Sequence, residues 1–283
     1  MNLLGARVLG ADRLGCHCLL LESDAGLVLV DTGFGTVDME RPVPRLSRLF
    51  VTLTRPEFDP LDTAVEQVRE LGFKPEAVKH ILLTHLDFDH AGGIADFPAA
   101  TVQELADEAE AARHRHGFVA RRRYRPAQWR AAAGTWREHK PADQWFGFDA
   151  IRPLGVPDLL MVRLPGHSIG HCGVAVRDEG RWLLHAGDAY YHHGEMNVRG
   201  PRAPVPVRAA EWLLDVDRHQ CRLTRALLRE LAARSTGEVT VFCSHDLTEL
   251  QSLQRAAERR LRPRPAPVHP RPGSPAPARD SAA

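Results

Sequence analysis

A block of ligand-type side chains directly after an apolar run constrains the fold of this chain more than any other feature. The run Ile81-Leu82-Leu83 predicts a buried strand, and the chain then reads Thr-His-Leu-Asp-Phe-Asp-His-Ala-Gly-Gly up to residue 93. Four potential metal ligands occupy six positions there: His85, Asp87, Asp89 and His90. The two glycines permit a tight turn and a close approach of the backbone to a metal pair. The block therefore predicts a metal site at the tip of a buried strand.

Three further predicted strands also end in a histidine or an aspartate. They are 159–164 before His167, 182–185 before Asp188, and 239–243 before His245. A single residue of this kind is more often structural than a metal ligand. Four strand ends in one chain, each presenting His or Asp, favour one shared metal centre.

Strand and helix patterns alternate along the chain, which predicts an α/β fold. The apolar run 27–30 predicts a strand that delivers Asp31 at its end, and residues 23–26 predict a hairpin turn before it. The same patterns predict a helix from Pro60 to Leu71 capped by Asp59, a strand at 173–177 with a turn at 178–180, and a helix at 208–233.

Residues 101–157 differ from the rest of the chain. Helices are predicted at 104–112 and 118–133, and a cluster of Trp and Phe follows, which serves either as packing or as a pocket wall. Seven arginines lie between positions 113 and 130, and acidic residues precede them. This mixture predicts a solvated face of mixed charge rather than a phosphate-binding surface.

With these motifs in place, residues 8 to about 250 resemble the metallo-β-lactamase superfamily, and among its branches they look most like the N-acyl homoserine lactone lactonases. The resemblance rests on the block 84–93, the Pro165-Gly166-His167 turn, Gly187-Asp188-Ala189 and Ser244-His245-Asp246. It implies a four-layer αβ/βα sandwich with a two-metal site at one edge of the sheets. We therefore expect a hydrolase domain at 1–261, with 101–157 inserted near the site.

The resemblance also implies a role for each ligand-type residue. One metal would be held by His85, Asp87 and His167, the other by Asp89, His90 and His245, with Asp188 bridging the two. Asp89 would also orient the attacking water, and Tyr191 occupies the position of a tyrosine that contacts the substrate oxygen in the lactonase branch. Asp31 and Thr84 are candidates for orienting the ligand imidazoles.

Asp87 departs from the family pattern, which has histidine at this position. The extra carboxylate lowers the net charge of the metal centre by one, and this predicts a harder first site that tolerates Mn²⁺ or Fe²⁺ better. The implied cofactors are two divalent ions, with Zn²⁺ as the expected metal and Mn²⁺ or Fe²⁺ as alternatives.

The implied activity is hydrolysis of a small ester or lactone, of the N-acyl homoserine lactone type, by a hydroxide that two metals activate. A phosphodiesterase or nuclease is the main alternative, since Asp87 and the arginines suit phosphate. A thioesterase of the glyoxalase type, a di-iron oxidoreductase and an inactive metal-binding protein remain further alternatives.

Composition bears on partners and compartment. The chain has 283 residues, with 37 Lys and Arg against 36 Asp and Glu, so it lacks a field that would attract nucleic acid. No apolar run has the length of a membrane span or the pattern of a secretory signal. The five cysteines form no disulfide pattern. We therefore expect a cytoplasmic protein with a small-molecule substrate. Cys16 and Cys18 are expected to pack on a strand. The proline-rich residues 262–283 are expected to form a disordered tail. The oligomeric state is not readable from this pattern.

Overall fold

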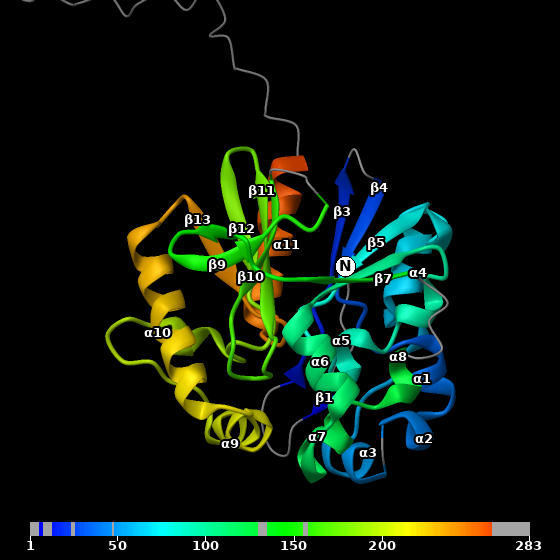
Figure 1. Ribbon diagram of the computed structural model, residues 1–283. Coiled ribbons are helices and arrows are strands. Elements are labelled where there is room, and N and C mark those ends of the chain that lie inside the picture. Colours follow the sequence, from blue (N-terminus) through cyan, green and yellow to red (C-terminus); the bar gives the residue numbers. More distant parts are fainter. Residues whose placement is uncertain are drawn as a thin grey trace, which may run out of the picture.

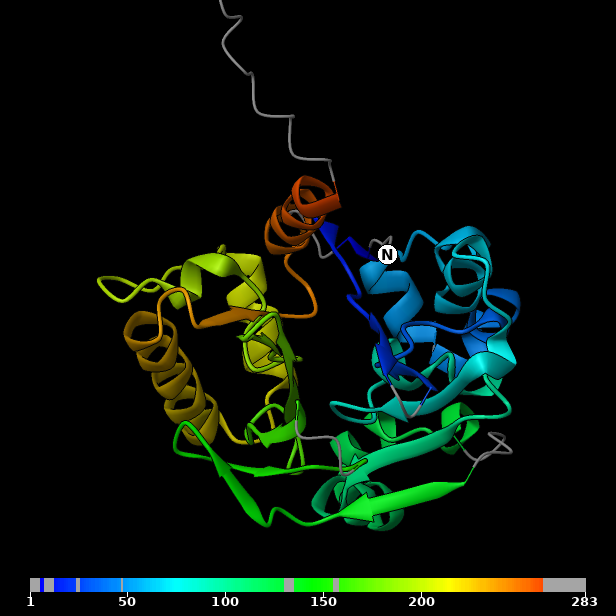
Figure 2. The ribbon, with the colours of Figure 1, turned by 90° about the horizontal axis from the view of Figure 1, so that it is seen from above.

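Two mixed β-sheets face each other at the centre of the molecule, with helices on their outer faces (Figures 1 and 2). The computed structural model describes residues 6–7, 13–23, 26–46, 48–129, 135–154 and 158–261. The predicted tail at 262–283 and the central residues of the predicted turn at 23–26 lie outside the described residues. The arrangement confirms the expected four-layer sandwich.

The first sheet has the strand order β3-β4-β5-β6-β7. Its strands are β3 (Leu19–Ser23), β4 (Gly26–Val30), β5 (Val78–Leu82), β6 (Thr101–Leu105) and β7 (Trp136–His139). β3 and β4 pair antiparallel, as a hairpin requires, and β4 to β7 pair in parallel. The carboxyl ends of β4, β5 and β6 therefore lie at one edge of the sheet.

The second sheet has the strand order β13-β12-β11-β10-β9-β8. Its strands are β8 (Asp143–Trp145), β9 (Phe148–Ile151), β10 (Leu159–Arg163), β11 (Cys172–Asp178), β12 (Arg181–His185) and β13 (Val239–Phe242). β11 and β12 form the hairpin predicted around residues 178–180. β13 pairs in parallel with β12, so the residues after both strands emerge at the same edge.

Helices surround the two sheets. They are α1 (Thr36–Glu40), α2 (Pro42–Leu46), α3 (Arg48–Thr54), α4 (Ala64–Glu70), α5 (Phe88–Ala91), α6 (Ala106–His114), α7 (Gly117–Arg123), α8 (Pro126–Trp129), α9 (Val205–Leu214), α10 (Arg218–Arg234) and α11 (Leu247–Leu261). Short 3-10 helices span Pro60–Asp62, Pro75–Ala77, Ile94–Asp96 and His193–Met196, and β1 (Ala6–Arg7) pairs with β2 (Arg13–Leu14). Within the described residues, no helix combines the length and apolar character needed to cross a bilayer.

Alternating side chains along the strands build three apolar layers. In β4, Val28 packs between the two sheets, while Leu29 faces the helices that cover the first sheet. In β10, Met161 packs between the sheets, while Leu160 faces α10 and contacts the cluster around Leu228. Strands covered on both faces are apolar at consecutive positions, which explains the unbroken runs in the sequence.

The structure divides several predicted helices. Residues 101–105 form strand β6, so the helix predicted at 104–112 begins two residues later as α6. The helix predicted at 118–133 is the two short helices α7 and α8, and residues 130–134 lie outside the described residues. Asp59 caps only the 3-10 turn that follows it, whereas Thr63 accepts the capping hydrogen bond of α4. The periodicity of apolar residues located these helical segments, but it did not reveal where capping residues divide them.

The helix predicted at 208–233 is also two helices, and the break between them contacts the predicted site. Asp217 caps α10 by accepting from the backbone N–H groups of His219 and Gln220. The backbone N–H groups of Val216 and Asp217 donate to the Gly166 carbonyl at 3.1 and 2.9 Å. The break therefore docks onto the turn that carries His167.

The aromatic cluster in 101–157 serves mainly as packing. Trp145 of β8 is buried and lies 5.6 Å, ring to ring, from Trp182 of β12. Trp129 and Trp136 lie 6.4 Å apart and pack beside the first sheet. These rings cover the edges of both sheets.

Candidate metal centre

The seven predicted ligands come together at the edge where the two sheets meet. His85 and Asp87 lie in the loop after β5, Asp89 and His90 lie in α5, and the other three follow β10, β12 and β13. In Figure 1, α5 lies below the strands, near the middle of the picture. Parallel pairing of β12 with β13, and the position of β5 inside its sheet, bring these loop ends together although they are far apart in sequence.

The glycines after α5 are needed for close packing, but not against the ligands. A Cβ on Gly92 would lie 2.2 Å from Asp38 Oδ2, and one on Gly93 would lie 2.8 Å from the Thr32 carbonyl. The close packing seen at these glycines is therefore made against the chain that supports α5.

The predicted first site joins His85, Asp87 and His167. Asp87 Oδ2 lies 3.0 Å from His167 Nε2 and 3.4 Å from His85 Nε2. Burial opposes ionisation of Asp87, but the charges of Arg123 and His85 outweigh it and hold the pKa of this carboxyl well below its usual value. The carboxylate is therefore ionised and faces two imidazole nitrogens.

The predicted second site joins Asp89, His90 and His245. The Nε2 atoms of His90 and His245 each lie 3.9 Å from an Asp89 oxygen. Asp188 reaches into both sites: its Oδ1 lies 3.2 Å from His90 Nε2, and its Oδ2 lies 3.0 Å from His245 Nε2 and 3.6 Å from His167 Nε2. Asp188 thus lies close to histidines of both predicted sites.

All four histidines turn the same nitrogen inward. Each Nδ1 lies beside an oxygen acceptor: Thr84 Oγ1 at 3.0 Å for His85, Asp31 Oδ2 at 2.8 Å for His90, Asp215 Oδ1 at 3.4 Å for His167, and the Gly15 carbonyl at 2.6 Å for His245. A proton on Nδ1 leaves the Nε2 lone pair free, which is the tautomer that a metal ligand requires. The four Nε2 atoms all face the aspartates described above.

Several of the inward atoms have no hydrogen bond among the described residues. These buried atoms are His85 Nε2, His90 Nε2 and Asp188 Oδ1. Buried polar atoms are nearly always paired, and a shared cation pairs with such atoms directly. Imidazole nitrogens combined with carboxylate oxygens suit divalent transition metals, so the donor set fits a pair of such ions.

Asp31 and Thr84 take the orienting positions that the sequence suggested. Asp31 Oδ1 accepts from the Thr84 backbone N–H and Oδ2 accepts from the Thr84 hydroxyl, both at 2.8 Å. Asp31 adopts a φ of 55°, a left-handed conformation that is uncommon for an aspartate. The two residues join the ends of β4 and β5 behind His85 and His90.

Asp215 and Glu108 also support the site, and the sequence reading missed both. Asp215 lies behind His167 and pairs with Arg225 at 3.1 Å. Glu108 of α6 accepts from the Leu86 backbone N–H, from the Ser168 hydroxyl and from the Gly170 N–H. It thereby ties the loop after β5 to the loop after β10. The sequence pattern placed both residues within predicted helices, and it gave no indication that their carboxylates contact the loops that hold the ligands.

Arg123 contradicts the prediction of a solvated arginine face. Its side chain is 5% exposed, and its Nε lies 3.0 Å from Asp87 Oδ1. The guanidinium also donates to the carbonyls of His167 and Leu214. The neighbouring Arg121 and Arg122 are exposed, as the sequence predicted. Three consecutive arginines of one short helix therefore differ in burial, because only Arg123 faces the rest of the protein.

Cys16 also differs from its prediction. The strand begins at Leu19, so residues 15–18 are an irregular segment that pairs with the chain at 244–245 through backbone hydrogen bonds. This places the Cys16 thiol within 4.8 Å of ligand atoms of Asp89 and His245. Burial, then the charge of Asp89, raises the pKa of this thiol well above its usual value. All five cysteines are free, as expected.

The predicted catalytic tyrosine lies over the centre. The ring of Tyr191 is buried, with its centroid 4.7 Å from that of His245 and 6.0 Å from that of His167. Burial, then the charges of Asp188 and Asp215, raises the pKa of its hydroxyl well above the usual value. A tyrosine in these surroundings keeps its proton at neutral pH and can donate it in a hydrogen bond.

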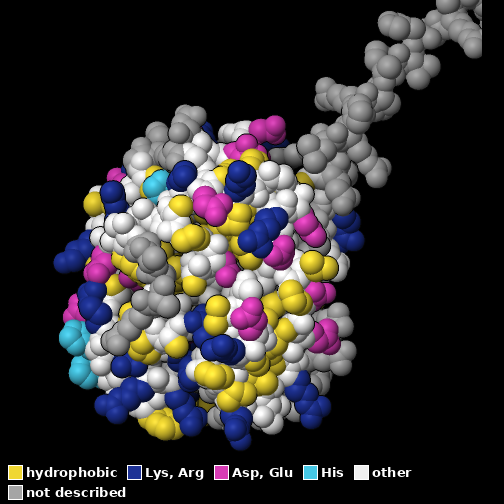
Figure 3. Space-filling view, turned by 90° about the vertical axis from the view of Figure 1, so that its right-hand side faces the viewer, with side chains coloured by type: hydrophobic (Ala, Val, Ile, Leu, Met, Phe, Trp, Pro, Cys, Tyr) yellow, Lys and Arg dark blue, Asp and Glu magenta, His cyan; other side chains and the backbone are white. Residues whose placement is uncertain are grey.

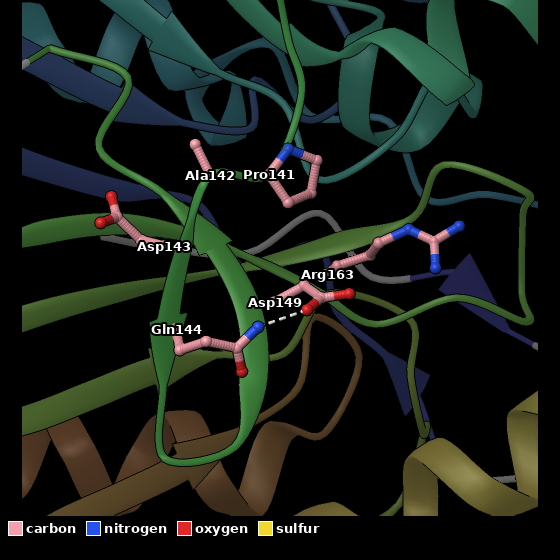
Figure 4. Close-up of a pocket in the computed structure, with 6 residues that line it drawn as sticks. All are labelled: Pro141, Ala142, Asp143, Gln144, Asp149 and Arg163. Carbon is pink, nitrogen blue, oxygen red and sulfur yellow. Dashed lines mark hydrogen bonds between the residues drawn. The ribbon is translucent and has the colours of Figure 1, made fainter.

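A hollow of about 560 Å³ lies elsewhere, beside the β8–β9 hairpin (Figure 4). Its charged side chains are paired: Asp143 with Arg152, Arg163 with Asp107, and Asp149 with Gln144. The hollow contains none of the predicted ligands.

Comparison with known proteins identifies the family. The model of the metallo-beta-lactamase superfamily matches residues 11–245, which include every predicted ligand. The chain belongs to the metallo-beta-lactamase superfamily. Enzymes of this superfamily bind pairs of divalent metals, in agreement with the donor set described above.

Sequence relatives agree with this membership. The protein named "Probable metallo-hydrolase Rv2300c" of Mycobacterium tuberculosis is 43% identical over 258 residues, which cover 90% of this chain and 80% of the relative. An N-acyl homoserine lactonase of Bacillus cereus is 26% identical over 167 residues, which cover 59% of this chain and 60% of that protein. This superfamily member is accordingly a metallo-hydrolase.

Solved structures confirm the superfamily fold. An N-acyl homoserine lactone hydrolase with bound N-hexanoyl-L-homoserine aligns with a TM-score of 0.64 at 21% identity, over 89% of this chain and 97% of the other. The dizinc quorum-quenching lactonase AidC aligns with a TM-score of 0.56 at 17% identity, over 83% and 74% of the two chains. At this level of identity the likeness concerns the fold.

Proposed function

We propose that this metallo-hydrolase opens lactones of the N-acyl homoserine lactone type, or cleaves closely related small esters, with two divalent ions, of which Zn²⁺ is the preferred one. The observation that carries the proposal is the common orientation of four histidines, each with Nδ1 at an oxygen acceptor and Nε2 facing Asp87, Asp89 or Asp188. The lactonases among the relatives support the choice of substrate.

Two sets of residues would hold the ions: His85, Asp87 and His167 for the first, and Asp89, His90 and His245 for the second, with Asp188 shared. When bound, the pair polarises the carbonyl under attack and lowers the pKa of water toward about 7. Six of these seven side chains are buried and only Asp89 is partly exposed. Burial keeps the six away from bulk water and strengthens the electrostatic interactions among them.

Asp89 and Tyr191 would complete the reaction. The side chain of Asp89 is 22% exposed, compared with 3% for Asp188, so it is the carboxylate that best reaches an entering water molecule and accepts its proton. The Tyr191 hydroxyl keeps its proton because burial raises its pKa, and it can donate a hydrogen bond to the oxygen that gains negative charge.

Phosphodiesterase activity has less support. Arg123 is the arginine nearest the predicted ligands, and its donors already engage Asp87 and two backbone carbonyls. On the face seen in Figure 3, basic side chains are interspersed with acidic and hydrophobic ones and form no continuous basic surface. Neither feature provides donors for a nucleic-acid backbone.

The proposal is tested with purified protein loaded with Zn²⁺, Mn²⁺ or Fe²⁺. A panel of lactones, esters, thioesters and phosphodiesters is assayed after elemental analysis of the protein. Lactone opening is expected in the wild type and in a His219→Ala control, whose side chain is exposed on α10, but not in His90→Ala. Equal activity in His90→Ala would contradict the proposed site, and preferential cleavage of phosphodiesters would contradict the proposed substrate.

A further inference from the structure

Arg123 is a buried cation beside the first metal site, and the family pattern does not account for it. It comes from the end of α7, in the segment 101–157, and reaches the loop of His167 on the opposite sheet. Its Nη2 donates to the Leu214 carbonyl at 2.7 Å, at the end of α9. One guanidinium therefore connects α7, α9 and the metal centre.

The two oxygens of Asp87 have different neighbours. Oδ1 faces Arg123 Nε at 3.0 Å, whereas Oδ2 faces the Nε2 atoms of His167 and His85 at 3.0 and 3.4 Å. The arginine thus holds one oxygen and leaves the other directed at the proposed metal position. A carboxylate held in this way presents a single donor atom, as an imidazole does.

The charges of this pair also cancel. Asp87 contributes one negative charge where the superfamily pattern has a neutral histidine, and Arg123 contributes one positive charge that a protein cannot remove by deprotonation. The sequence alone predicted a metal centre with one unit less positive charge. With Arg123 included, the centre has the same net charge as the pattern with histidine.

We propose that Asp87 and Arg123 act as one unit that replaces the usual histidine of the first metal site. The proposal rests on the metal ligands assigned above. Asp87 is the ligand, and Arg123 is a positioning residue that fixes the orientation of its carboxylate and balances its charge. Each residue is functional only in the presence of the other.

The contacts of Arg123 argue against a role in binding substrate. Its Nη1 and Nη2 donate to the carbonyls of His167 and Leu214, and Nη2 also lies 3.3 Å from His167 Nε2. Its Nε forms an ion pair with Asp87 Oδ1 at 3.0 Å. Burial of the side chain removes it from entering molecules as well. An arginine that recognises an anionic substrate needs free donors directed at solvent or a cavity, and Arg123 satisfies neither condition.

The unit is tested by restoring the family residue with and without the arginine. Asp87→His leaves a buried guanidinium without its carboxylate and next to two imidazoles, so first-site metal affinity is expected to fall at least ~10-fold. Asp87→His combined with Arg123→Met removes the unbalanced charge and is expected to restore two ions per chain. Arg121→Met, on the same helix but exposed, is the matched control and is expected to match the wild type.

Metal content is measured by elemental analysis after dialysis at a fixed free Zn²⁺ concentration, and circular dichroism reports folding. The ion at the second site is expected to remain in Asp87→His, which serves as an internal control of the centre. If Asp87→His fails to fold while the double variant folds and binds two ions, the proposal is supported as well, because the double variant differs only at Arg123.

Two results would overturn the proposal. If the Asp87→His variant bound two ions as tightly as the double variant, Arg123 would not be coupled to this position. If the double variant bound only one ion, histidine could not replace the pair. A wild type that binds no metal would overturn the ligand assignment and this proposal together. A wild type that binds two ions without opening any lactone would overturn only the proposed substrate, and the metal counts still decide the role of the pair.

Discussion

The proposed first and second metal sites both include Asp188, but their other ligands are supported largely by different parts of the chain. Behind the second site, Asp31 and the Gly15 carbonyl hold His90 and His245, and both come from the N-terminal segment and β4. Behind the first site, Asp215 and Arg123 contact His167 and Asp87, and they come from α9–α10 and the 101–157 segment. The proposed second site is thus supported from the N-terminal segment and the first sheet. In the proposed first site only His85 is supported from that sheet, through Thr84, whereas His167 and Asp87 are supported from peripheral helices.

This difference suggests how the two sites vary independently. Residues at the end of β4 are fixed by strand pairing on both sides, because β4 lies between β3 and β5. α7 and α9 lie outside both sheets, so their sequences can change without disturbing strand register. The departure from the usual ligand pattern, Asp87, lies in the proposed first site, next to Arg123.

The largest effect is expected from the residue that the two sites share. Asp188→Asn removes a charge that faces both sets of histidines, so both ions should be lost and hydrolysis should fall roughly 10³-fold. Elemental analysis and the lactone assay measure the two outcomes. Retention of both ions with full activity would show that Asp188 does not bridge them.

Paired variants behind the ligands should separate the two sites. Asp31→Asn is expected to weaken metal binding about 10–100-fold at the second site, and Asp215→Asn to weaken it by a similar factor at the first. Titration of the metal-free protein with Zn²⁺ resolves which site loses affinity. If both variants weakened the same site, the division of support described above would be wrong.

A smaller effect is expected from the carboxylate that ties the two ligand loops together. Glu108→Gln places an amide where the Leu86 and Gly170 N–H groups and the Ser168 hydroxyl now donate to a carboxylate. The free energy of unfolding should fall by about 1–3 kcal/mol, as measured by denaturant titration. First-site metal affinity should fall more than second-site affinity, because Ser168 adjoins His167. An unchanged unfolding curve would contradict this role.

The smallest effect concerns Glu104, a buried carboxyl of β6 that serves as a control for Glu108. Burial, then the charge of Glu108, raises the pKa of Glu104 to about 8. The folded protein therefore holds this proton more tightly than the unfolded chain, and stability from this group is lost as pH rises through about 8. In the Glu104→Gln variant, the unfolding temperature measured between pH 6 and 9 should fall less steeply with rising pH than in the wild type. Both metal affinities should stay unchanged. An equally steep loss in the variant would exclude Glu104 as its source.

The sequence was most informative where ligands follow strands. His85, Asp87, Asp89 and His90 stand directly after an apolar run, and a strand tip is a fixed position in any sheet, so their convergence could be anticipated. The helices were less predictable, because capping by Thr63 and Asp217 divides patterns that look continuous.

The sequence by itself determined the family and the layered fold and supplied the proposed metal ligands, because these depend on local patterns and on motifs of fixed spacing. Only the tertiary structure revealed Arg123, Asp215 and Glu108, which lie 36, 48 and 22 positions from the partners they support. Whether a helical side chain meets solvent or a buried carboxylate depends on which surface the helix packs against. That packing decided that Asp87, the residue that departs from the family pattern, is balanced by an arginine rather than left as an excess negative charge.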